Sequence, residues 1–161
     1  MMHHPRRGMF VNSLGEKETQ EINSIRIVLE AEAMKLCRAR FTLRMNDNLT
    51  RIVKAMERWE GGSELDAAAL DLEFHRTLWS FGGNPYLART LDSLVRIVLA
   101  NHALDGIGHE MVRWSLNHHR VLLEVVQGES RFTPEEAIVT HLRLCYSNPE
   151  RVSSVGLTEK R

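Results

Sequence analysis

The feature that most constrains the fold is the spacing of the apolar residues after position 16. They recur at intervals of three and four, as in one face of an α-helix, and no strand-like alternation appears after residue 15. Ile22, Leu29, Ala33 and Leu36 form the first such stripe. The pattern predicts an all-α fold, an antiparallel bundle of about six helices with a short irregular or β-type N-terminal arm.

The expected helix bounds follow from breaker and capping residues. Asp47 is a plausible cap for the second helix, and Gly128 ends the fifth. Thr133, Pro134 and Glu136 form a capping box that opens the sixth. The helices are expected at about 17–43, 46–59, 64–81, 85–103, 108–127 and from 134 to near 147. This divides the chain into an arm (1–16), a helical domain (17–148) and a loose tail (149–161).

Composition limits the possible functions. At 161 residues the chain is expected to form one domain, and its net charge of zero argues against nucleic-acid binding by the domain itself. No apolar run is long enough for a membrane span, and the N-terminus lacks the apolar core of a signal peptide. Cys37 and Cys145 are expected to be buried free thiols in a reducing cytoplasm.

Histidine placement is the strongest chemical feature, because motifs such as HExxH, CxxC and the phosphate loop are absent. Asp71 and His75 lie one helical turn apart. His141 shares a face with apolar residues of the sixth helix. In the fifth helix, His118 and His119 both align with apolar neighbours, and periodicity alone does not choose between them.

These residues have two interpretations. Each histidine alone is more often a core or boundary residue than a ligand. Three inward imidazoles and a carboxylate in one small bundle also suit a divalent ion such as Zn²⁺ or Ni²⁺, with an open position for water or a carboxylate. Arg26, on the apolar stripe of the first helix, presents a similar choice. It either forms a salt bridge within the bundle or binds the carboxylate or phosphate of a small ligand.

Four segments, in order, resemble the FCD (FadR C-terminal) domain of GntR-type bacterial transcription regulators. They are "IRIVLEAEAMKLCRARFT", "DLEFHRTLWSFGGNPYL", "HHRVLLEVVQGE" and "EEAIVTHL". The resemblance covers about residues 17–146. Asn117, Glu124 and a longer "ESRFTPEEA" link depart from the family pattern.

The resemblance implies a metal site. Metal-binding members use an Asp and three His, and the matching positions here are Asp71, His75, His118 and His141. His118 is chosen over His119 because it lies ten positions before Gly128. The family's first-helix Arg, which often meets an acidic effector, matches Arg26.

The resemblance also implies a function. The chain is expected to be the effector-sensing domain of a regulator, to bind a divalent metal and a small organic acid, and to form a homodimer. "RRGMFVNSL" resembles the end of a winged-helix wing, so the DNA-binding domain is expected to be missing through a fragment, a late start or a loss. The alternatives are a structural or dimerisation domain with a closed metal site or none, and, less favoured, a metal-dependent enzyme; we expect no enzyme.

Overall fold

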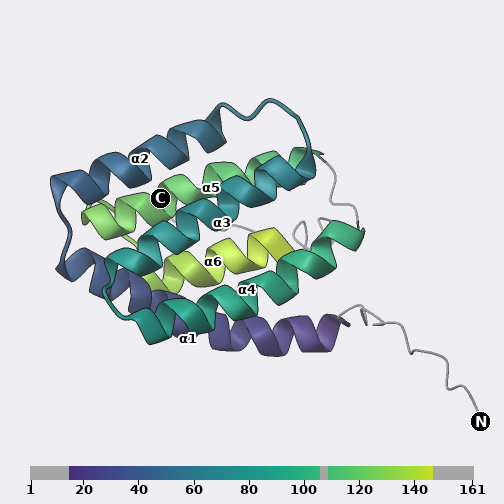
Figure 1. Ribbon diagram of the computed structural model, residues 1–161, viewed down its shortest axis with the longest axis horizontal. Coiled ribbons are helices and arrows are strands. Elements are labelled where there is room, and N and C mark those ends of the chain that lie inside the picture. The colour runs from purple at the N-terminus through teal and green to yellow at the C-terminus, as the bar shows by residue number, and fades with distance from the viewer. Residues whose placement is uncertain (1–14, 106–108, 147–161) are drawn as a thin grey trace, which may run out of the picture.

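The computed structural model is an all-α bundle, as predicted (Figure 1). It describes residues 15–105 and 109–146, and within them every side chain but those of 99–105, 109, 111 and 144–146. The helices are α1 (Glu16–Ala39), α2 (Leu43–Glu57), α3 (Glu64–Phe81), α4 (Pro85–Asp105), α5 (His109–Gln127) and α6 (Pro134–Tyr146). No strand occurs in these ranges. The predicted N-terminal arm and C-terminal tail lie outside the described residues.

The first helix packs against most of the bundle. α1 contacts α3, α4, α5 and α6, whereas α2 contacts only α3 and α5 among the described elements. Figure 1 shows α2 on one side of the bundle and α1 with α4 on the other. A polar side chain on the inner face of α1 is therefore surrounded by helices that are distant from α1 in sequence.

Capping residues begin and end several helices as predicted. The Glu136 backbone N–H donates to Thr133 Oγ1 at 3.2 Å, and the Thr133 N–H donates to Glu136 Oε2 at 2.9 Å. These two bonds form the predicted capping box. Gly128, just after α5, has a φ of 82°, which a glycine adopts without strain.

The junction between α1 and α2 differs from the prediction. α1 ends at Ala39, and α2 begins at Leu43 with Thr42, not Asp47, as its cap. Thr42 has an extended backbone, and its hydroxyl accepts the Met45 N–H at 3.3 Å. Since Asp and Thr are both good caps, their order in the sequence alone did not show which one the chain uses.

The buried stripe of α1 is also rotated from the expected one. Ile22, Leu29 and Leu36 are only partly buried. The fully buried positions are Arg26, Glu30, Ala31, Ala33, Met34 and Cys37. Cys37 is a free thiol with an exposed fraction of 0%, as predicted, and burial raises its pKa to about 12. The side chain of Cys145 is outside the described residues. Within the described part of the chain, no helix is long and apolar enough to span a membrane.

Candidate metal centre

Helix α3 carries two of the candidate ligands, Asp71 and His75. Ser63 caps the helix by accepting the Leu65 N–H at 3.0 Å. Phe74 and Leu78, both buried, hold this face of the helix against the core. His75, beside Phe74, is therefore buried with an exposed fraction of 2%.

Helices α5 and α6 bring two more histidines to the same point. One ligand atom each from Asp71, His75, His119 and His141 lies within 4.8 Å of the others. The Nε2 atom of His75 is 3.2 Å from His141 Nε2 and 3.3 Å from His119 Nε2. His119 Nε2 is also 3.2 Å from Asp71 Oδ1. Three helices separated in sequence thus place four donor atoms together.

Partners on the other ring nitrogen orient two of these imidazoles. His119 Nδ1 lies 3.1 Å from the Ser115 carbonyl oxygen and 3.2 Å from that of Leu116. His75 Nδ1 lies 3.0 Å from Glu30 Oε2. Carbonyl and carboxylate oxygens accept hydrogen bonds, so Nδ1 carries the proton in both rings. Nε2 of each ring is then left to take part in the cluster.

The structure places His118 beside this group, not within it. Its ring stacks on that of His141, with centroids 5.6 Å apart, and its buried Nδ1 has no hydrogen-bond partner. One residue along α5 rotates a side chain by about 100°, and here the inward position is His119. The candidate set therefore contains His119 in the place that the sequence-based prediction gave to His118.

Arg26 is buried, with an exposed fraction of 1%, and it contacts an acidic side chain of its own helix. Its Nε and Nη2 atoms each lie 2.9 Å from Glu30 Oε1. Its Nη1 donates to Asn23 Oδ1 at 3.3 Å. Of the two interpretations given above, this is the salt bridge within the bundle. Sequence reasoning did not identify Glu30, although its position one turn after the inward Arg26 was an available indication.

The electrostatics of the cluster depend on burial and on these contacts. Burial opposes ionisation of Asp71, but the hydrogen bond and charge of His119 outweigh it and lower the pKa of Asp71 to about 2. Burial also opposes protonation of His75, yet the charge of Glu30 and its hydrogen bond raise the His75 pKa. Burial, together with the charges of His119 and His75, lowers the pKa of His141 well below the usual range. Burial also lowers the pKa of His118, to about 4.

The donor set fits a first-row divalent ion. Three imidazole nitrogens and one carboxylate oxygen suit zinc or nickel. Two nitrogens bound to one tetrahedral zinc ion at about 2.0–2.1 Å lie about 3.3 Å apart. The distances from His75 Nε2 to the other two imidazoles, 3.2 and 3.3 Å, match this spacing. Two inward lone pairs at such a distance repel each other unless a proton or a metal ion lies between them.

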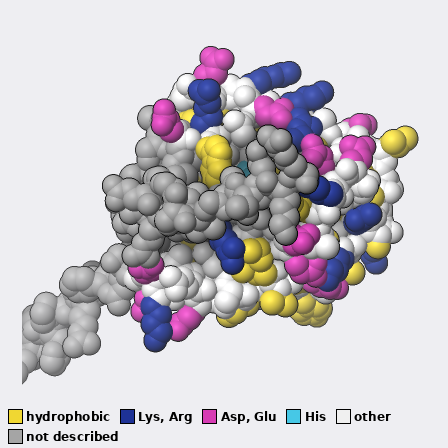
Figure 2. Space-filling model, turned by 180° about the vertical axis from the view of Figure 1, so that it is seen from behind, with side chains coloured by type: hydrophobic (Ala, Val, Ile, Leu, Met, Phe, Trp, Pro, Cys, Tyr) yellow, Lys and Arg dark blue, Asp and Glu magenta, His cyan; other side chains and the backbone are white. Residues whose placement is uncertain are grey.

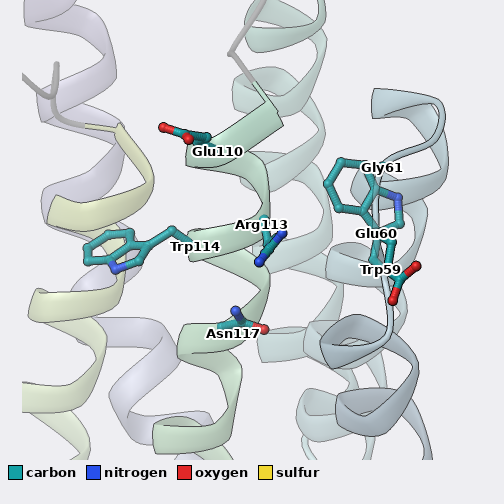
Figure 3. A pocket seen from close by; sticks show the side chains of 7 residues that line it. All are labelled: Trp59, Glu60, Gly61, Glu110, Arg113, Trp114 and Asn117. Carbon is teal, nitrogen blue, oxygen red and sulfur yellow. The ribbon is translucent and has the colours of Figure 1, made fainter.

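A separate pocket of about 330 Å³ lies between the α2–α3 connection and the first half of α5 (Figure 3). In Figure 3, Trp114 points away from the side of α5 that faces Trp59. No candidate metal ligand lines this pocket. Its lining residues are Trp59, Glu60, Gly61, Glu110, Arg113, Trp114 and Asn117.

Comparison with known proteins gives two matches. The model of the FCD domain family matches residues 21–144. A curated protein of Bacillus subtilis (strain 168), named "Uncharacterized HTH-type transcriptional regulator YdhC", is 26% identical over 141 residues. The aligned region covers 84% of this chain and 62% of that relative, so the chain spans less than two thirds of the relative's length. No solved structure matches the chain.

Proposed function

This chain belongs to the FCD domain family, and we propose that it is the effector-sensing domain of a transcription regulator and binds a divalent metal ion. The proposed ligands are Asp71, His75, His119 and His141. Zinc or nickel is the proposed ion. When bound, it supplies a Lewis-acidic centre inside the bundle that can coordinate an anionic group of a ligand.

The convergence of four donor atoms from three helices carries this proposal. A purely structural histidine cluster would be expected to satisfy its ring nitrogens with donors and acceptors of the protein. Here the Nδ1 atoms of His75 and His119 lie against protein oxygens. Nε2 of His75 faces two other imidazoles, and Nε2 of His119 faces both an imidazole and Asp71 Oδ1. One divalent cation could be bound by all three imidazoles and by the Asp71 carboxylate together.

The proposed effector is a small organic acid whose carboxylate coordinates the metal. Three imidazoles and one carboxylate leave a position open on an ion that accepts more than four ligands. The Arg26 guanidinium already pairs with Glu30 at 2.9 Å. A direct ion pair between the acid and Arg26 would therefore require the acid to displace Glu30. We therefore propose the metal as the anchor of the acid. In a dimer, binding of the acid would shift the bundle and change the spacing of two DNA-binding domains.

We propose that DNA binding belongs to a winged helix-turn-helix domain outside this chain. The relative named an HTH-type regulator is longer than the region that this chain matches. On the face shown in Figure 2, Lys and Arg side chains are interspersed with Asp and Glu, and the net charge is zero. Among the described residues of this face, the basic side chains do not gather into the kind of patch that binds DNA phosphates. We also propose that the protein forms a homodimer and acts in the cytoplasm.

Metal analysis of the protein, purified without chelator and without an affinity tag, tests the metal site. We expect about one zinc or nickel ion per chain, since the four ligands form a single site. Less than about 0.2 ion per chain, both as purified and after incubation with each metal and gel filtration, would contradict it.

A thermal-shift screen of small carboxylic acids on the metal-loaded protein tests sensing. A true effector at 100 times its dissociation constant should add about 2.7 kcal/mol to the free energy of unfolding. The metal-free protein is the control, and it should show no shift. If no acid raises the melting temperature of the metal-loaded protein, the structural or dimerisation role is favoured. If the loaded protein converts such an acid to product, the enzyme alternative is favoured.

A further inference from the structure

A continuous chain of buried contacts joins the first helix to the candidate metal centre. Arg26 contacts Glu30 Oε1 through Nε and Nη2, both at 2.9 Å, and Glu30 Oε2 lies 3.0 Å from His75 Nδ1. The side chains of all three residues are 1–2% exposed. The Nε2 atom of the same His75 ring faces His119 and His141. Glu30 thus contacts the Nδ1 edge of the His75 ring, and the Nε2 edge of the same ring faces the proposed metal position.

We propose that Glu30 is a positioning residue of the metal centre, held in place by Arg26. It keeps the proton of His75 on Nδ1 and turns Nε2 toward the ion. The inference rests on the proposed metal site. It assigns the buried Arg26–Glu30 pair a role in metal affinity, and it makes α1 part of a site whose ligands all come from α3, α5 and α6.

The chemistry explains why a charged pair would be kept here. An isolated carboxylate in this position would cost several kcal/mol in desolvation, and a hydrophobic pair would pack the helix at least as well. An ionised carboxylate accepts the Nδ1 proton and increases the basicity of Nε2, as outer carboxylates do for histidine ligands of metals. Arg26 holds this carboxylate in place, since its Nε and Nη2 atoms each lie 2.9 Å from Glu30 Oε1.

The test is the dissociation constant for Zn²⁺, measured by competition with a chromophoric chelator at pH 7.5. Glu30→Gln preserves the shape of the side chain and removes its charge. We expect zinc affinity to fall about tenfold to a hundredfold, the usual effect of losing an outer-shell partner. The matched control is Glu32→Gln on the same helix, where the side chain is exposed. This control should bind zinc as the wild type does.

Proton NMR of the zinc-loaded protein gives a second readout that mere destabilisation of the fold would not move. A hydrogen bond to a carboxylate shifts the His75 Nδ1 proton downfield and slows its exchange with water. We expect this resonance to move upfield and to exchange faster in Glu30→Gln, with the corresponding resonance of His119 unchanged. If Glu30→Gln does not fold, the neutral pair Arg26→Met with Glu30→Gln replaces it in both measurements, with the same expected changes.

The outcomes are distinguishable. Wild-type affinity in Glu30→Gln, with an unchanged His75 resonance, would overturn the positioning role and leave the metal site intact. Absence of zinc binding by the wild type and by Glu32→Gln alike would overturn the metal site itself and the inference with it. Equal weakening in Glu30→Gln and Glu32→Gln would indicate a nonspecific effect of charge and would also overturn the positioning role.

Discussion

At the scale of single residues, the chemistry depends on which edge of each imidazole faces the centre of the bundle. His75 and His119 hold a proton on Nδ1 because oxygen atoms accept it there. The sequence predicts His75 and His141 as inward residues from the apolar residues beside them, and Asp71 because it lies one helical turn before His75. It does not separate His118 from His119, because α5 has buried residues over a wide arc, including Leu122 and Leu123 in succession.

Counting back from the end of α5 gave His118, and such counts depend on where a helix ends. Helix ends vary by one or two residues between related proteins, and one residue rotates the side chain by about 100°. His119 lies three residues after Leu116 and four before Leu123, both fully buried. The register with these core residues defines the inward face better than the distance to Gly128.

Substitution of the two adjacent histidines tests this register. We expect His119→Gln to weaken zinc binding by at least about a hundredfold, because it removes one of four proposed ligands. His118→Gln, one residue away, should change the dissociation constant by less than about threefold. Competition titration with a chelator measures both, and circular dichroism confirms that each variant is folded. The opposite ranking would assign the ligand to His118.

Metal binding should depend on pH in a defined direction. The raised pKa of His75 means that the metal-free protein keeps a proton there to a higher pH than an ordinary histidine does. A metal must displace that proton, so affinity should rise as pH rises through the raised pKa and fall on acidification. Because the pKa of His141 is lowered, this residue carries no proton that competes with the metal near neutral pH. Calorimetry in two buffers of different ionisation enthalpy measures the protons released when the metal binds. A metal affinity that does not change with pH between about 6 and 8 would contradict the predicted competition between metal and proton.

At the scale of helices, capping chemistry was predictable where only one good cap was present. The end of α3 follows from Gly82 and Gly83, and the start of α6 follows from the Thr133 capping box. The start of α2 was not predictable, since Thr42 and Asp47 compete for the role and tertiary packing decides. The buried face of α1 was predicted only in part. The apolar spacing placed Arg26 on the inward stripe, but it did not include Glu30, which is buried together with Arg26 as an ion pair.

The capping box of α6 has a measurable effect on stability. Thr133→Ala removes the acceptor of the Glu136 N–H and should reduce the free energy of unfolding by about 1 kcal/mol. Thr140→Ala is the control on the same helix, because this exposed residue lies in the helix interior and Ala is the better helix former there. Urea denaturation of the metal-free protein measures both. Equal midpoints for Thr133→Ala and the wild type would contradict the capping role.

At the scale of the whole molecule, the polar cluster joins parts of the chain that the sequence separates. Apolar packing against α1 brings α3, α5 and α6 together, and the histidines meet at that junction. The fold class, the family and three of the four members of the cluster could be predicted from the sequence. The fourth member and the Glu30 contact depend on helix rotation, which the sequence pattern defines poorly where a helix is buried over a wide arc.

A metal at this junction should stabilise the entire bundle. The ligands are together only in the folded state, so zinc at 100 times its dissociation constant should add about 2.7 kcal/mol to the free energy of unfolding. A chelator should lower the melting temperature of the protein as purified, and zinc should restore it. In His119→Gln, the same additions should have little effect. If neither chelator nor zinc changes the melting temperature, the proposal that a metal ion links the helices is contradicted.

The most direct test of the central claim is a crystal structure of the metal-loaded protein, with anomalous diffraction recorded on both sides of the metal's absorption edge. We predict a single anomalous peak per chain, in direct contact with Asp71, His75, His119 and His141, with His75 still bound to Glu30. No peak at this position, or a peak coordinated by His118 with His119 outside the coordination sphere, would contradict the account.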